Sequence, residues 1–170
     1  MELLKKMRGD RASPPPRSSL SIILATVVAA IAVIGGLSFL ASESGVLLLL
    51  GSFAASTLIV FAYPDSPFAQ PRNVIFGHLI GSACGLACTH LLPGHWWASA
   101  LAVGAAIGVM KLTRTIHPPA CSNPLIVFAL TQAPWTFLIF PTLAGASLIV
   151  LVALFYHNLR REARWPKYWL

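Results

Sequence analysis

Acidic side chains are scarce in this sequence, which has 5 Asp and Glu residues against 12 Lys and Arg residues in a length of 170. Only 10% of the residues are charged, compared with roughly 25% in an ordinary soluble domain, and 56% are hydrophobic. This composition excludes a soluble globular enzyme. Because a membrane-spanning helix needs about 20 apolar residues, the length allows about four to six spans and leaves no room for a second, water-soluble catalytic domain.

Groups that catalyse reactions or bind metals are also few. The three cysteines, Cys84, Cys88 and Cys121, lie in apolar surroundings without a CxxC pair, so we expect reduced and packed thiols. No HxxxH or histidine–carboxylate spacing is present, and we expect no metal ion and no other cofactor. The apolar segments hold almost no carboxylates and no nucleophile–base pair, which disfavours a proton-coupled cation carrier and an enzyme. An anion or a small neutral molecule is the favoured substrate.

Positive charge is concentrated in two tails, the Pro-rich residues 1–19 and residues 160–170. Charge at the ends of an apolar chain favours a membrane surface as the partner, whereas a nucleic acid would require a basic patch on a folded surface. The first apolar run lacks an A-x-A cleavage site, so we interpret it as a span and not as a removable signal peptide. We therefore expect a lipid bilayer and no nucleic acid as the partner.

Six apolar runs lie between the tails, at residues 20–41, 45–63, 74–92, 96–110, 124–133 and 135–156. If the N-terminus is cytoplasmic and every run crosses, all twelve Lys and Arg residues fall on the cytoplasmic side, as the positive-inside rule favours. The alternative has four spans, with the second and fifth runs re-entrant, and it places Arg72, Lys111 and Arg114 outside. We prefer six segments in an all-α, multi-pass protein of a bacterial inner (plasma) membrane, with both termini in the cytoplasm.

An internal repeat supports this count. The pentapeptide LIVFA at residues 58–62 recurs at residues 125–129, an offset of 67 that also places the first apolar run over the fourth and the third over the sixth. Two units of three crossings insert in opposite orientations, which is the inverted-repeat plan of many transporters. We expect a single membrane domain at residues 20–159, made of repeats at about 20–92 and 96–159, with the second and fifth helices broken.

The fifth segment carries the most unusual chemistry. The prolines in and just before this segment leave backbone N–H and C=O groups without helical hydrogen bonds. Such groups cannot face lipid, so the stretch must pack against protein or line a wet cavity. Asn123 before Pro124 is typical of a helix start, with Ser122 as the nearby alternative cap. The positive end of that short helix would point into the break beside His117, which favours an anion site.

Two polar positions on the third segment each have two interpretations. Arg72 can snorkel to lipid headgroups or face a substrate. His78, like His117, can be a neutral structural histidine bonded to a carbonyl, or part of a site, since polar groups at membrane depth are costly. The same segment carries Gly77, Gly81 and Gly85, which we expect to pack within the chain or, as the alternative, to form a homo-oligomer interface.

Several of these residues together resemble one family. SPFAQPRNV at residues 66–74, GHL at 77–79, HPPA at 117–120 and NPL at 123–125 resemble the HPP family of integral membrane proteins over roughly residues 20–159. Cys121 is a departure, because Gly commonly follows HPPA in that family. The resemblance implies a small multi-span protein, usually described with four spans, some of whose plastid and cyanobacterial relatives are described as nitrite transporters.

We therefore expect a transporter or channel for a small inorganic anion, with nitrite as the first candidate. The alternative is a non-transporting membrane scaffold or ligand-sensing module. The residues expected to bind the substrate flank the two broken segments: Arg72, Asn73, His78, Arg114, His117, Pro118, Pro119, Ser122 and Asn123.

Overall fold

The structure is a computed structural model that describes residues 13–45, 48–130 and 133–170, and this part of the chain is helical without any strand. Its six α-helices are α2 (Leu20–Ser44), α3 (Gly51–Ala62), α4 (Pro71–Leu91), α5 (Ala98–Thr113), α6 (Asn123–Ala129) and α7 (Ala144–Arg160). Three of the connections contain short helical turns: the 3-10 turns η1 (Pro67–Ala69), η2 (Pro118–Ser122) and η3 (Trp135–Leu138), and the π turn η4 (Ile139–Leu143). Lys5, Lys6, Arg8 and Arg11 of the expected basic tail lie outside the described residues.

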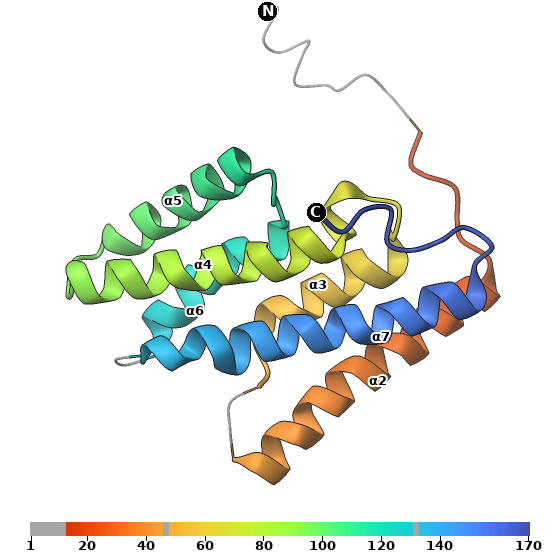
Figure 1. Cartoon of the computed structure of the whole chain (residues 1–170), viewed down its shortest axis with the longest axis horizontal. Helices are drawn as coiled ribbons and strands as arrows, with labels where there is room; N and C mark the ends of the chain where they lie inside the picture. Colours follow the sequence, from red (N-terminus) through yellow and green to blue (C-terminus); the bar gives the residue numbers. More distant parts are fainter. Residues whose placement is uncertain (1–12, 46–47, 131–132) are drawn as a thin grey trace, which may run out of the picture.

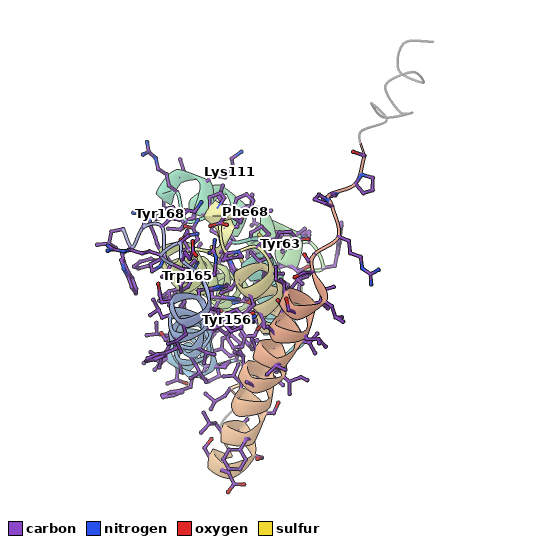
Figure 2. All side chains as sticks on the ribbon, turned by 90° about the vertical axis from the view of Figure 1, so that its right-hand side faces the viewer. Tyr63, Phe68, Lys111, Tyr156, Trp165 and Tyr168 are labelled. Carbon is purple, nitrogen blue, oxygen red and sulfur yellow. The ribbon has the colours of Figure 1, made fainter. Side chains whose placement is uncertain are left out.

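Helix α4 is the central element of the bundle (Figure 1). It contacts α5, α6 and α7, while α2 packs against α3 and α7 at the edge. The chain runs back and forth between the two ends of the bundle, so that the start of α2, the start of α4 and the end of α7 lie at the same end (Figure 1). Figure 2 looks onto that end, with Phe68, Lys111 and Tyr168 labelled.

Hydrogen bonds and ion pairs tie the loops of this end together. Arg161 Nη2 lies 2.8 Å from Asp65 Oδ2, which joins the C-terminal tail to the loop before α4. Arg72 Nη2 donates to the backbone carbonyl of Thr113 at 2.9 Å, which joins the start of α4 to the end of α5. The described Lys and Arg residues lie in these segments or, for Arg17, just before α2, so the positive-inside rule predicts that this end is cytoplasmic.

Three segments are long and apolar enough to cross a membrane, namely Leu20–Ser44, Pro71–Leu91 and Trp135–Arg160. Gly51–Ala62 and Ala98–Thr113 are shorter apolar helices. Helix α6 has seven residues, which corresponds to about 10 Å of helix against the roughly 30 Å of a bilayer core. The second and fifth of the described helices are thus the shortest, while the number of crossings and the inverted repeat stay predictions.

The glycine-rich face of α4 packs against the broken segment of the same chain. A Cβ added at Gly77 would lie 2.6 Å from His117 Cβ, and one at Gly85 would lie 2.8 Å from Pro124 Cα. At Gly81 it would overlap the carbonyl oxygen of Ala120. The structure therefore has the intramolecular packing that we expected as the first alternative for these glycines, and their face is filled without a second copy of the chain.

Candidate solute-binding site

Four polar side chains meet in the interior of the bundle, where α3, α4 and the start of α6 come together. They are Ser56 on α3, His78 on α4, His117 at the residue before η2 and Asn123 at the start of α6, and none is exposed to solvent. The close approach of η2 and α6 to the glycines of α4 brings His117 and Asn123 to His78. We call these four residues the polar cluster.

Ser56 lies between the two histidines. Its Oγ is 2.7 Å from His78 Nε2 and 2.9 Å from His117 Nε2. His117 Nδ1 is 2.8 Å from the carbonyl oxygen of Phe68, so this nitrogen carries a proton and donates. In a neutral ring, His117 Nε2 is then an acceptor, and the Ser56 hydroxyl donates to it.

The hydrogen bond from Asn123 gives His78 the opposite tautomer, with the proton on Nε2. Asn123 Nδ2, which only donates, lies 3.0 Å from His78 Nδ1, so this nitrogen accepts and His78 Nε2–H donates to Ser56. The result is a chain of donors that runs in one direction, from Asn123 through His78, Ser56 and His117 to the Phe68 carbonyl. Ser56 Oγ also lies 3.0 Å from the carbonyl of Ser52, so its single proton has two alternative acceptors.

Asn123 extends the cluster toward η4, the turn before α7, and its side chain contains an oxygen without a hydrogen-bond partner. Its Nδ2 donates to Ser82 Oγ at 2.9 Å, and Ser82 Oγ lies 2.9 Å from Thr142 Oγ1. Its Oδ1 is buried and has no hydrogen-bond partner. An unsatisfied buried acceptor costs about 1–3 kcal/mol, so this oxygen is a position where a donor from a bound molecule would be stabilising.

No charged side chain takes part in this network. Within the described part of the chain, the hydrogen bonds of the four cluster residues all go to neutral side chains or to the backbone. The same part of the chain contains no group of three or more His, Cys, Asp or Glu residues placed to hold a metal ion. The polar cluster is therefore an uncharged site as long as both histidines are neutral.

The structure brings three of the expected site residues together, His78, His117 and Asn123. Asn73 lies nearby at the start of α4, where its Nδ2 donates to the Ile116 carbonyl at 2.8 Å and its Oδ1 accepts from Tyr168 Oη at 3.0 Å. It therefore fixes the segment that leads into His117.

The remaining expected residues lie outside the cluster. Arg72 is half-buried and its guanidinium caps the end of α5, whereas Arg114 is exposed in a left-handed conformation with φ 57°. The Ser122 hydroxyl donates to the carbonyl of Pro119 at 2.8 Å within η2. Pro118 is exposed and Pro119 is buried.

Sequence reasoning missed Ser56, Ser82 and Thr142. Ser82 carried a usable signal, because it follows His78 by four residues and so lies on the same face of a helix. Ser56 was visible only as a small polar residue in an apolar run. Its partners lie 22 and 61 residues away, so their approach depends on the tertiary fold.

Comparison with known proteins identifies the kind of chain. A family model described as the transmembrane region of HPP proteins matches residues 15–166. A transmembrane protein of Dictyostelium discoideum is 39% identical over 128 residues, which cover 71% of this chain and 45% of that protein. A second transmembrane protein of the same organism is 35% identical over 134 residues, covering 75% of this chain and 43% of that protein. The chain thus spans less than half the length of these relatives, and no solved structure matches it.

Proposed function

Because this chain belongs to the HPP transmembrane family, we propose that it moves a small inorganic anion across the bilayer, with nitrite as the first candidate and the polar cluster as its binding site. Some plastid and cyanobacterial relatives in this family are described as nitrite transporters, which supports nitrite as the first candidate. The observation that carries the proposal is the polar cluster itself, which includes the unpartnered Oδ1 of Asn123.

Burial of polar groups at membrane depth supports a functional site over a packing feature. Polar and ionisable residues in membrane segments are expensive and usually mark the path of a solute or a proton. Here α3, α4 and α6 each contribute to one network around two histidines, in a bundle that otherwise buries mainly apolar side chains.

The chemistry of the cluster favours an anion that arrives with a proton. Nitrite alone is only an acceptor, whereas Asn123 Oδ1 requires a donor. Nitrous acid supplies an O–H for this oxygen. When the O–H bond of nitrous acid breaks, the proton forms an N–H bond at His78 Nδ1, the ring nitrogen that accepts from Asn123 Nδ2 in the structure. The Asn123 amide then rotates so that its Oδ1 accepts this new N–H and its Nδ2 donates to the nitrite, and the site with its solute keeps zero net charge.

The basic end of the bundle can attract anions toward the polar cluster. Lys111 and Arg114 are exposed there, and Arg72 lies at the start of α4. Clustered positive charge raises the local concentration of anions. Asn73 and the Phe68 carbonyl connect this surface to His117 and hence to the polar cluster.

Nitrite flux into liposomes that contain the purified protein tests the proposal. We expect uptake to rise when the outside is made more acidic than the inside, and to fall to the level of empty liposomes in Ser56→Ala and His117→Gln. His95→Gln is the matched control, because His95 is exposed near the opposite end of α4. Flux in Ser56→Ala and His117→Gln equal to that of the wild type would show that the assigned site is wrong, even if transport is real.

One observation favours the second candidate, a ligand-sensing module without transport. The polar cluster is sealed from solvent, and the broken segment packs tightly on the glycine face of α4. In that case, isothermal calorimetry would detect nitrite binding that Ser56→Ala abolishes, while the liposomes would show no flux above background.

A further inference from the structure

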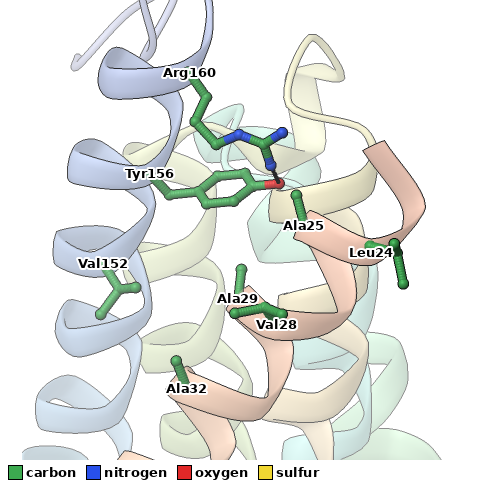
Figure 3. A pocket seen from close by; sticks show the side chains of 8 residues that line it. All are labelled: Leu24, Ala25, Val28, Ala29, Ala32, Val152, Tyr156 and Arg160. Carbon is green, nitrogen blue, oxygen red and sulfur yellow. Dashed lines mark hydrogen bonds between the residues drawn. The ribbon is translucent and has the colours of Figure 1, made fainter. Parts of the chain in front are cut away.

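The geometry points to a binding site for an anionic glycerophospholipid in the groove between α2 and α7, with one acyl chain in the groove and the phosphate on Arg160. This site is independent of the polar cluster and of the proposed transport. Its apolar part is a hollow of about 460 Å³ lined by eight residues, Leu24, Ala25, Val28, Ala29, Ala32, Val152, Tyr156 and Arg160 (Figure 3).

Small side chains on α2 create the hollow. Ala25, Ala29 and Ala32 face Val152 of α7 and leave space that larger residues would fill (Figure 3). The stretch from residue 24 to residue 32 is about 12 Å long along the helix. Because α2 lies at the edge of the bundle and most of its surface is exposed, this groove opens toward the surrounding lipid.

Arg160 and Tyr156 form a polar shelf at the end of the groove that lies toward the basic end of the bundle. Arg160 Nη1 donates to Tyr156 Oη at 3.1 Å, and the guanidinium carbon lies 5.3 Å from the centre of the Tyr156 ring (Figure 3). No carboxylate pairs with Arg160 among the residues that the structure describes. Its guanidinium is thus a cation held at the mouth of an apolar groove.

A second hollow of about 340 Å³ continues beyond the shelf and shares Tyr156 and Arg160 with the first. Its lining combines apolar side chains with the polar residues Ser18, Asp65 and Arg161. Both oxygens of Asp65 accept hydrogen bonds from Arg161, at 2.9 and 2.8 Å, so this carboxylate is already neutralised. The first hollow is apolar, and the adjoining one has a net positive charge from Arg160 and Arg161 against Asp65. Such a pair of hollows matches the acyl chain and the phosphate of one lipid molecule.

Native mass spectrometry of the detergent-solubilised protein tests this site. The protein is mixed with phosphatidylglycerol or phosphatidylcholine of the same acyl chains, and retained lipid is measured. We expect preferential retention of one phosphatidylglycerol, weakened about tenfold or more by Arg160→Gln, since the charge-assisted hydrogen bonds to phosphate are lost. Ala32→Leu, which fills the groove, should weaken retention of both lipids.

Two matched controls accompany these variants. Arg164→Gln removes a charge from the same tail outside both hollows, and Ala105→Leu enlarges an exposed alanine on α5. Both should retain phosphatidylglycerol like the wild type. Glycerol 3-phosphate, which has the phosphate but no acyl chain, should fail to displace the lipid at equal concentration.

Several results would overturn the assignment. Equal retention of the two lipids, or unchanged retention in Arg160→Gln, would show that Arg160 does not recognise the phosphate of an anionic lipid. Displacement by glycerol 3-phosphate indicates a site for free phosphate compounds. A change from dimer to monomer in Ala32→Leu without a change in bound lipid indicates that a second copy of the chain occupies the groove.

Discussion

The contact between α4 and the broken segment leads to a sharp prediction for Gly81→Ala. The new methyl carbon would overlap the carbonyl oxygen of Ala120 and lie 3.3 Å from Asn123 Cβ. Overpacking of this kind costs about 1–3 kcal/mol, while replacing glycine in a helix returns up to about 1 kcal/mol. We expect a net destabilisation of about 1–2 kcal/mol, which is roughly a 5–30-fold shift of the folding equilibrium.

Gly104→Ala is the matched control, because Gly104 also lies within a helix but has no atom within 4 Å of the added Cβ. We expect this variant to be as stable as the wild type or more stable by up to about 1 kcal/mol. Unfolding in mixed micelles with increasing dodecyl sulfate, followed by circular dichroism, compares the two. Equal stability of Gly81→Ala and Gly104→Ala would refute the packing of η2 against α4.

Gly145 provides a comparison with Gly81, because the added methyl group would meet a side chain and not the backbone. At Gly145 the added Cβ would meet the ring of Phe53, with Phe53 Cζ at 2.6 Å. Because the obstacle is a side chain, the second substitution Phe53→Leu should restore part of the stability lost in Gly145→Ala. No change of side chain at Ala120 removes the carbonyl that obstructs Gly81, so that variant should have no such rescue.

Three further predictions concern hydrogen bonds, charge and topology. Ser56→Ala should destabilise the protein by about 1–3 kcal/mol by leaving Nε2 of both histidines without its hydrogen-bond partner, whereas Ser52→Ala, which removes a hydroxyl without a partner, should be nearly neutral in the same unfolding assay. The hydrogen bond from Arg161 lowers the pKa of Asp65 from 3.8, so Asp65→Asn should cost about 0.2–1 kcal/mol at neutral pH. This difference should vanish as the pH falls through the lowered folded-state pKa, and a difference that persists in acid would contradict the ion pair. A reporter fused in the loop at residues 63–66 should report the cytoplasm, and external exposure would exclude six crossings.

The helices were predictable because their signals are local. The apolar run at 20–41 corresponds to α2, and the proline-opened run at 74–92 corresponds to α4, which begins at Pro71. The short fifth segment, expected at 124–133, is the seven-residue α6. Length of the apolar run and the position of proline are enough to find such elements from sequence.

The polar cluster was predictable only in part, because its contacts join distant parts of the chain. His78 and His117 stood out as rare histidines beside unusual segments. Arg72 also stood out, but nothing local shows that its guanidinium binds the carbonyl of Thr113, 41 residues away. A serine in an apolar helix is often only a packing residue. The role of Ser56 therefore becomes visible only in the fold, where its hydroxyl lies between the two histidines.

The separation of charged residues from the polar cluster bears on how the proposed transport of an anion would take place. Arg72, Lys111 and Arg114 lie at one end of the bundle, whereas Asn123, His78 and the rest of the polar cluster are uncharged and buried. A bare anion that left the basic end would lose its water and gain no fixed positive charge in the interior. An anion that carries a proton enters as a neutral species, or shares the proton with a histidine on arrival. Flux should therefore follow the concentration of the protonated acid, so that at a fixed total nitrite concentration it falls about tenfold for each pH unit above the acid's pKa. Flux that instead follows total nitrite at every pH would contradict this mechanism.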